Sequence, residues 1–465
     1  MIPIEGLPIV RAAAMRAAEE AVFASGVPQA DLMERAGAAV AREAARLAMG
    51  RQVLVLAGPG NNGGDAWVAA RLLAKSGHDV MVAALGEAKE GAAAAMRAQW
   101  TGKVVDLAEA PARSIVVDGL FGTGLTRPLA ADVAGHLQRL VTAAHFTLAI
   151  DLPSGMDTDL GRDLGTAGAT VTLALGAFKP AHLLGDGLDR CGHVLLDDIG
   201  IPIATAWRTV AMPRLSAPAS HSQKYTRGLV AILEGRMPGA ARLAANAALH
   251  GGAGYVVRIG DDDDSQGPNA IVHRPMAEFA KLLEDDRTGA LVIGPGLGRD
   301  GDVSARLDAA IASPRPLVLD GDALSLIGRD VGKLRNRAAP TCLTPHSGEF
   351  DRLFGEGKGS KIDRTLTAAA EAGAVIVHKG ADTVIATPEG DVRVYAGGSP
   401  WLSTAGTGDV LAGLLGARLA GGVAPLAAAE AAVWLHGRAA QLAGPAFAAD
   451  DLIPCLPRAI AECLR

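Results

Sequence analysis

The chain has 465 residues, of which 49% are hydrophobic and only 3% aromatic, and its formal net charge is -6 at pH 7. This length predicts two large domains or three smaller ones, with cores built from aliphatic side chains. The negative charge and the lack of a lysine- and arginine-rich run argue against nucleic-acid binding. We find no signal peptide and no apolar stretch of about 18 residues, so we expect a soluble, cytoplasmic protein with no membrane partner.

The cysteines are few and scattered. Cys191, Cys342, Cys455 and Cys463 lack C-x-x-C spacing, which predicts reduced thiols rather than a zinc site or a disulfide framework. An acidic run, Asp261–Asp264, could hold a metal ion, but no further ligands accompany it at a fixed spacing. A solvated loop is therefore the simpler interpretation of that run.

The first part of the chain alternates between helical and strand patterns. Two helices are expected between residues 9 and 48, separated near Gly26–Pro28, with Asp31 and Glu34 as a capping box for the second. Strands are expected at residues 53–57, 80–83, 114–118, 147–151 and 170–174. Short apolar strands separated by helices are typical of a doubly wound parallel sheet.

Polar and glycine-rich loops follow three of these strands, at Gly58–Asp65, Asp118–Pro128 and Asp151–Gly155. In an open α/β sheet, loops at the carboxyl ends of the strands share one edge, where ligands bind. Singly, each loop is more often a turn than a site. Their convergence is what predicts a ligand site in this domain.

A second alternating series follows a proline-containing stretch at 202–220, which we interpret as a linker. Its strands are expected at residues 228–233, 254–259, 290–294, 316–320 and 374–378, with an antiparallel hairpin at 383–386 and 392–395. The sequence therefore predicts two doubly wound α/β domains, residues 1–210 and 211–465.

Thr404–Asp409, with the sequence T-A-G-T-G-D, directly precedes an apolar pattern that is long enough for a buried helix. Glycines before a helix leave backbone N–H groups free, and the helix dipole adds positive potential, so the turn suits a phosphate. Asp409 could then act as a base toward a hydroxyl group. A glycine-rich helix start with Asp409 as a first-turn charge is an equally good interpretation of the bare motif.

Together, the motifs resemble two known families. The first half resembles the NAD(P)H-hydrate epimerases through residues 32–37, 58–65, 117–125 and 150–155. The second half resembles the ADP/ATP-dependent NAD(P)H-hydrate dehydratases through residues 221–228, 238–242, 294–298, 344–349, 379–380 and 405–409. The resemblance implies a Rossmann-like three-layer sandwich followed by a ribokinase-like domain. The two halves also follow one another in the order that the resemblance implies for a bifunctional nicotinamide nucleotide repair enzyme.

Such an enzyme acts on hydrates of NADH and NADPH, in which water has added across the 5,6 double bond of the reduced ring. The resemblance implies that the first domain interconverts the R and S hydrates. It also implies that the second domain dehydrates the S form with ADP as co-substrate, ATP being the alternative nucleotide. Magnesium is expected with the nucleotide, and a potassium ion is implied in the epimerase site.

In the first domain, the resemblance assigns the acid/base role to Asp151, at the end of a predicted strand. The implied potassium ligands, all hard oxygen donors, are Asn62, Asp118 and Ser154. The implied substrate-binding residues are Asn61, Asn62, Gly63, Gly64, Asp65, Gly122, Thr123, Gly124, Leu125, Thr126, Arg127 and Pro128. Arg127 could equally be a surface charge, and Lys179 is a weaker candidate for substrate contact.

In the second domain, Asp409 matches the catalytic base. The residues that match the adenine-nucleotide site are Lys379, Gly380, Ala381, Asp382, Thr383 and Gly408. Ala240, Gly298 and His346 match substrate contacts, although a histidine in such a turn is more often a loop residue with satisfied hydrogen bonds.

Two other interpretations remain open from the sequence. The second domain could be a kinase for a stable small-molecule hydroxyl group, because a G-T-G-D turn alone does not separate a kinase from a dehydratase. The first domain could then be a non-catalytic binding module. We expect small-molecule partners only, apart from assembly into a homo-oligomer.

Overall fold

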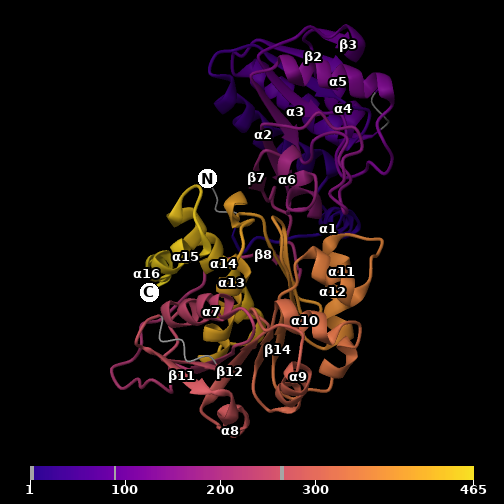
Figure 1. Cartoon of the computed structure of the whole chain (residues 1–465). Helices are drawn as coiled ribbons and strands as arrows, with labels where there is room; N and C mark the ends of the chain where they lie inside the picture. The colour runs from indigo at the N-terminus through magenta and orange to yellow at the C-terminus, as the bar shows by residue number, and fades with distance from the viewer. Residues whose placement is uncertain (1–4, 88–90, 262–266, 465) are drawn as a thin grey trace. The chain divides into compact units, whose positions relative to one another are not determined.

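The structure is a computed structural model that describes residues 5–87, 91–261 and 267–464. It contains two compact units, Met1–Arg208 and Thr209–Arg465, coloured indigo to magenta and magenta to yellow in Figure 1. Three aspartates of the acidic run, Asp262 to Asp264, lie outside the described residues, so its interpretation as a loop stays a prediction.

The first unit is built on a seven-stranded sheet in which the neighbouring strands are parallel. In spatial order the strands are β3 (Val104–Asp106), β2 (Val80–Ala84), β1 (Val53–Ala57), β4 (Ile115–Gly119), β5 (Phe146–Ile150), β6 (Val171–Leu175) and β7 (His193–Asp197). The chain winds outward in both directions from β1 and β4. The predicted doubly wound sheet is therefore confirmed.

Helices cover both faces of this sheet: α1 (Ala12–Ala24), α2 (Gln29–Ala48), α3 (Asn61–Lys75), α4 (Ala92–Ala98), α5 (Ala131–Ala143) and α6 (Gly187–Arg190). The side chains of β1 show the layers, because they alternate between two cores. Val53 and Val55 pack in a core with α2 and α3, whereas Leu54 and Leu56 pack with Leu137 and other side chains of α5. This is the expected three-layer sandwich.

Between α1 and α2, the predicted break near Gly26–Pro28 is confirmed, but the predicted capping box is wrong. The second helix begins at Gln29, directly after Pro28, so Asp31 lies inside the first turn rather than before it. Pro28 itself stays outside the helix with an extended backbone (φ -63°, ψ 143°), and no side chain caps the helix start.

The second sheet has ten strands, which lie in the second unit except for β8, where the chain passes from the first unit to the second. In spatial order its strands are β11 (Ile271–Pro275), β10 (Tyr255–Gly260), β9 (Leu229–Leu233), β12 (Thr288–Ile293), β13 (Leu317–Leu319), β14 (Thr341–Leu343), β15 (Val375–His378), β16 (Thr383–Ala386), β17 (Val392–Tyr395) and β8 (Trp207–Thr209). The pairs from β11 to β15 are parallel. The predicted hairpin of β16 and β17 is confirmed as antiparallel. The stretch 202–220 is not wholly irregular, because it contains β8, which is too short for a periodic signal.

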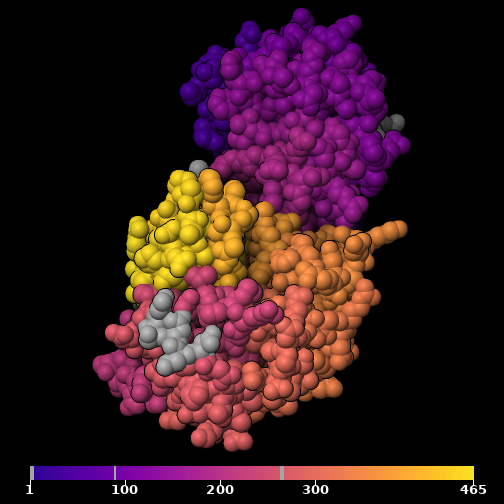
Figure 2. Space-filling view, viewed as in Figure 1, coloured from indigo at the N-terminus to yellow at the C-terminus, as the bar shows by residue number. Residues whose placement is uncertain are grey.

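The helices of the second unit are α7 (Pro238–His250), α8 (Phe279–Glu284), α9 (Val303–Ala312), α10 (Gly321–Ile327), α11 (Ser347–Phe354), α12 (Lys361–Ala372), α13 (Thr407–Ala420), α14 (Pro425–Ala443), α15 (Ala449–Leu452) and α16 (Leu456–Cys463). The predicted buried helix after the glycine turn is α13, most of whose side chains are buried. It shares one core with α7 and α14. In Figure 2, yellow C-terminal residues accordingly lie beside magenta residues from the start of the unit.

All four cysteines are buried and free, as expected for reduced thiols. Among the helices within the described ranges, none is both long enough and apolar enough to cross a membrane.

Two candidate active sites

The first candidate site begins at the turn between β1 and α3. The sequence predicts a loop through Asp65, but α3 already begins at Asn61, so Asn61 to Asp65 form the first helical turn. A Cβ on Gly63 would lie 1.8 Å from the carbonyl oxygen of Gly58, and a Cβ on Gly58 would lie 1.8 Å from that of Leu120. Only glycine permits this close approach, which brings the N–H groups of the helix start to the carboxyl edge of the sheet.

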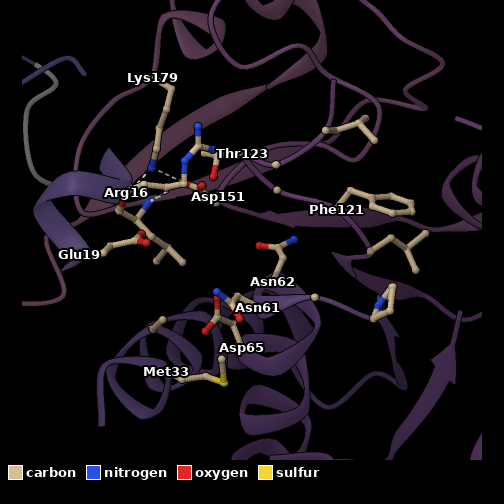
Figure 3. Close-up of a pocket in the computed structure, with 18 of the residues that line it drawn as sticks. Arg16, Glu19, Met33, Asn61, Asn62, Asp65, Phe121, Thr123, Asp151 and Lys179 are labelled. Carbon is tan, nitrogen blue, oxygen red and sulfur yellow. Dashed lines mark hydrogen bonds and ion pairs between the residues drawn. The ribbon is translucent and has the colours of Figure 1, made fainter. Parts of the chain in front are cut away.

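A cavity of about 840 Å³ lies at this edge. Its walls include residues from all three predicted loops, together with Arg16 and Glu19 of α1 and Lys179 (Figure 3). The expected substrate-binding residues that line it are Asn61, Asn62, Asp65, Gly122, Thr123, Gly124, Leu125, Thr126, Arg127 and Pro128. Gly63 and Gly64 do not line the cavity, since they pack toward Gly58 and Met33. The predicted convergence of the three loops is therefore present.

Asp151 lies just beyond β5 and is held in an unusual backbone conformation. Its φ is 64°, in the left-handed region that non-glycine residues seldom adopt. Its carboxylate Oδ1 accepts hydrogen bonds from the Lys179 ammonium at 2.5 Å and from the Leu175 N–H at 3.1 Å. Lys179 also donates to the Leu175 carbonyl at 2.6 Å. These bonds form a buried ion pair whose geometry is fixed by β6 and the loop that follows it.

His182 fixes the backbone beneath that ion pair. Its Nδ1 accepts the Lys179 N–H at 2.9 Å, so Nε2 carries the proton and donates to the Asp151 carbonyl at 2.6 Å. Burial, and then the charge of Lys179, lower the pKa of His182 to about 4. The ring is therefore neutral at pH 7 and supports Asp151 through hydrogen bonding alone.

Two further carboxyl groups face the same cavity. Burial raises the pKa of Asp65 well above its usual range, and the charges of Asp151 and Glu19 raise it further. Burial also raises the pKa of Glu19, against an opposing effect of Lys179. The cavity thus contains three carboxyl groups around one buried ammonium group, and burial disfavours the ionised forms of Asp65 and Glu19.

Asp118, Ser154 and Asn62 form an oxygen-rich group beside the cavity. Asp118 is buried, and its Oδ2 and Oδ1 accept from the Ser154 N–H at 2.8 Å and the Ser154 hydroxyl at 2.6 Å. The Asn62 amide Nδ2 is buried without a hydrogen-bond partner within the described residues. The oxygen atoms of a carboxylate, a hydroxyl and an amide are suitable ligands for a monovalent cation, whereas the Asn62 NH₂ group is a donor that would suit an acceptor oxygen of a substrate.

The second candidate site is the turn before α13. Gly406 precedes the helix with φ 89°, and a Cβ there would lie 2.7 Å from Leu243 of α7. The Thr407 hydroxyl donates to the carbonyl groups of Leu402 at 2.8 Å and Thr404 at 3.0 Å, which pins the turn. Asp409 therefore sits in the first turn of a well-anchored helix.

Asp409 faces a buried charge network at the carboxyl edge of the sheet. The Lys379 ammonium donates to Asp320 Oδ1 at 2.8 Å, and the Thr344 hydroxyl donates to the same oxygen at 2.7 Å. Gly408 belongs to this group, since a Cβ on it would lie 3.2 Å from Lys379 Nζ. Burial and the charges of Asp320 and Glu349 raise the pKa of Asp409 to about 7, against the opposing charge of Lys379.

The expected nucleotide residues form the turn from β15 to β16. Lys361 of α12 holds this turn, donating to Asp382 Oδ1 at 2.6 Å and to the Lys379 carbonyl at 3.2 Å. Thr383 closes it with a hydrogen bond from its hydroxyl to the Gly380 carbonyl at 2.8 Å. Gly408 lies beside the start of the turn, as described above, so Lys379, Gly380, Ala381, Asp382, Thr383 and Gly408 are brought together.

The expected substrate contacts of the second unit lie in three separate segments of the chain. Ala240 in α7 packs against Gly296, and Gly298 donates its N–H to Asp322 Oδ2 at 2.9 Å. His346 is largely exposed and caps α11, its Nδ1 accepting from the N–H groups of Gly348 and Glu349. The backbone of His346 forms an isolated parallel β-bridge with that of Lys379. The loop that contains Gly298 starts beside the Lys379 network, because Gly294 at its beginning approaches the Asp320 carbonyl closely.

Comparisons with known proteins cover both units. A family model described as "YjeF-related protein N-terminus" matches residues 29–181, and one described as "NAD(P)H-hydrate dehydratase" matches residues 230–460. A bifunctional NAD(P)H-hydrate repair enzyme of Gloeobacter violaceus is 37% identical over 93% of this chain and 93% of its own length. One of Thermofilum pendens is 34% identical over 93% of this chain and 91% of its own. The chain belongs to the bifunctional NAD(P)H-hydrate repair enzyme family.

A solved structure supports the fold of the second unit of this repair-family chain. A ribokinase-like superfamily protein of Enterococcus faecalis matches with a TM-score of 0.50 and 24% identity, covering 57% of this chain and 98% of that protein. At this identity the likeness concerns the fold alone. The predicted ribokinase-like α/β architecture is thus confirmed.

Several residues at the two sites of this repair-family chain were not predicted from the sequence. Arg16 and Glu19 come from α1, which precedes the first family match and carries no motif. His182, Asp320 and Lys361 were also missed. Asp320 ends a strand that the sequence does predict. Its position at the carboxyl edge of the predicted sheet is the one sequence signal that could have identified it as a site residue. The other four could be found only from the fold.

Proposed function

We propose that residues 1–210 epimerise the R and S hydrates of NADH and NADPH, and that residues 211–465 dehydrate the S hydrate with ADP. The observation that supports the proposal is that each unit has a carboxyl group held beside a lysine at the carboxyl edge of its sheet. Asp151 is paired with Lys179 in a cavity, and Asp409 faces the Lys379–Asp320 pair beside a phosphate-binding turn. Family membership supports the pairing of these two reactions in one chain.

In the first unit, the dinucleotide phosphates would lie at the start of α3, where free N–H groups and the helix dipole favour anions. Asn61, Asn62 and the Gly122–Pro128 loop would hold the ribose and nicotinamide portions of the substrate. Asp151 would exchange a proton at the hydrated ring. The ion pair with Lys179 would keep the Asp151 carboxylate oriented toward the substrate.

In the second unit, the chemistry turns a poor leaving group into a good one. Asp409 takes the proton of the hydrate's hydroxyl, whose oxygen attacks the terminal phosphorus of ADP and displaces AMP. The ring nitrogen's lone pair then expels phosphate, and loss of a proton from the neighbouring carbon restores the double bond. Lys379 and the N–H groups of Gly406 to Gly408 stabilise the negative charge that moves with the phosphoryl group.

Magnesium would accompany the nucleotide rather than occupy a protein site. Within the described ranges, no group of three or more histidine, cysteine, aspartate or glutamate side chains could hold a metal ion. Magnesium that is bound through phosphates and water needs few protein ligands, so a site without a carboxylate cluster fits an ion carried by the nucleotide. When bound, the ion supplies charge neutralisation on the phosphates.

Potassium would lie between Asn62, Asp118 and Ser154, and would supply positive charge close to the substrate phosphates. We expect epimer exchange to depend on potassium and to weaken in sodium or choline salts, while dehydration in the second unit stays unchanged. Asp118→Asn should remove that dependence because it removes the formal charge of the ligand set. Equal exchange rates with all three cations would contradict this cation assignment.

The whole proposal is tested by adding the protein to hydrated NADH and following the near-ultraviolet absorbance of the restored dihydropyridine ring. We expect recovery only with a nucleotide present, with ADP preferred over ATP, and from the R hydrate as well as the S hydrate. A small-molecule kinase with a non-catalytic first unit would give no recovery from either hydrate. No recovery from fresh S hydrate would therefore refute the proposal.

The raised pKa of Asp409 gives the dehydration step a pH dependence. A base must be ionised to act, so kcat/KM should fall about tenfold per pH unit below about pH 7. Asp320→Asn removes a charge that raises this pKa and frees Lys379 to pair with Asp409, so the fall should move to lower pH. A fall that does not move in the Asp320→Asn variant would show that a different group titrates.

A further inference from the structure

Glu19 is a carboxyl group of the first unit to which the proposed chemistry assigns no role. It lies in α1, ahead of the segment that matches the family model, and it lines the same cavity as Asp151. Within the described residues, its carboxylate has no hydrogen bond and no ion pair. The side chain is nevertheless half-buried. A carboxyl group that lines the cavity and is not engaged by another side chain is available to meet a ligand there.

Burial favours the protonated form of Glu19, and the charges around it act in both directions. Asp151 beyond β5 and Glu20 on α1 disfavour its ionisation, whereas Lys179 beyond β6 and Arg16 on α1 favour it, and burial has the largest effect. Asp65 of α3 faces Glu19 as well. Lys179 is already paired with Asp151 at 2.5 Å, so its charge is largely engaged there. Glu19 is thus suited to donate a proton, whereas the Asp151 carboxylate is held in place by the Lys179 ammonium and the Leu175 N–H.

The two carboxyl groups also reach the cavity from different elements. Asp151 is fixed at a strand end by Lys179, Leu175 and His182, whereas Glu19 extends from a helix. In Figure 3, Glu19 extends from α1 toward the space between Asp151 and Asp65. Epimerisation requires the hydroxyl group to leave from one face of the ring carbon and water to arrive at the other. Two proton-transfer groups on separate walls meet that requirement.

We propose that Glu19 is the second catalytic residue of the epimerase site, acting as the acid that complements the base Asp151. Glu19 gives its proton to the hydroxyl group, the ring nitrogen's lone pair forms a C=N bond, and the C–O bond breaks to release water. Water then adds to the other face, the C=N pair returns to nitrogen, and the proton released by that water goes to Asp151. A proton returns from Asp151 to Glu19 through solvent, so the cycle is balanced.

This inference rests on the proposed epimerase function, and a matched pair of variants separates the two. We expect Glu19→Gln to slow exchange of purified R and S hydrates by about 100-fold in kcat, the order of a lost acid catalyst. KM should change little. Glu20→Gln, one residue along the same helix but exposed, should exchange at the wild-type rate. Dehydration of the S hydrate by the second unit, measured in the same samples, reports that the variant is folded.

Two readouts distinguish a catalytic acid from a structural residue, and a third tests the chemical step. Glu19→Asp should recover at least part of the lost kcat, the alkaline fall of the exchange rate should disappear in Glu19→Gln, and exchange in ¹⁸O-water should place one solvent oxygen in the hydrate. A loss confined to KM, or an unchanged kcat in Glu19→Gln, would overturn the role of Glu19. Exchange without ¹⁸O uptake would overturn the step as written. If Asp151→Asn leaves exchange intact, the epimerase proposal itself fails.

Discussion

Replacement of Asp151 by Asn should reduce epimer exchange about 10³-fold, within the range for loss of a general acid/base. The amide keeps the size of the carboxyl group and tolerates the left-handed backbone at this position, so the fold should survive. It cannot exchange a proton, and Lys179 loses its ionic partner. Chromatographic separation of the R and S hydrates after incubation with the variant measures the loss.

The second unit provides the control for this variant. Dehydration of purified S hydrate with ADP should proceed at the wild-type rate, whereas the R hydrate should be consumed only as fast as it epimerises spontaneously. Equal loss of both activities would mean that the two reactions are not divided between the units as proposed.

Replacement of Asp409 by Asn should reduce nucleotide-dependent dehydration by about 10³-fold or more, since the hydroxyl group loses the base that activates it. The helix start is pinned by Thr407 and by the approach of Gly406 to Leu243, none of which involves the Asp409 carboxyl. The variant should therefore fold and still bind nucleotide. Recovery of dihydropyridine absorbance from S hydrate measures the rate, and calorimetric titration with ADP measures binding.

Epimer exchange should be unaffected in the same Asp409→Asn protein. Near-normal dehydration by this variant would show that another group is the base, and Asp320 would then be the first candidate, because it meets the same network. Loss of ADP binding together with activity would instead indicate a role for Asp409 in holding the nucleotide.

The sequence predicts the two sheets well because their strands are short, apolar and regularly spaced. It fails where local signals are weak. The strands β3, β8 and β14, which the sequence does not predict, have three residues each, and β7 and β11, also unpredicted, are edge strands of mostly half-buried residues. The helix α2 begins at Gln29, directly after Pro28, without a capping side chain. The start of α3 was placed too late, since two adjacent glycines usually indicate a loop. Here tertiary packing of Gly63 on Gly58 overrides that preference.

The candidate sites were predictable only as far as motifs extend. Asp151 and Asp409 follow from family motifs, and their positions at a strand end and a helix start agree with the structure. Their supporting residues do not follow from motifs. His182 acts on Asp151 through its backbone, Asp320 acts on Asp409 through charge, and Glu19 reaches the cavity from a helix distant in sequence. Such contacts depend on how elements pack, which a single sequence does not report.

The contact of Gly58 with both Gly63 and Leu120 has a consequence for ligand binding. It joins the start of α3 to the loop after β4 through backbone atoms, and the Gly58 N–H donates to the Gly119 carbonyl at 3.1 Å. The start of α3, where we propose that phosphates bind, and the loop beside the proposed cation ligands are thus preorganised as one rigid frame. Little conformational entropy remains to be lost there when a dinucleotide arrives, so more of its contact energy is available as affinity.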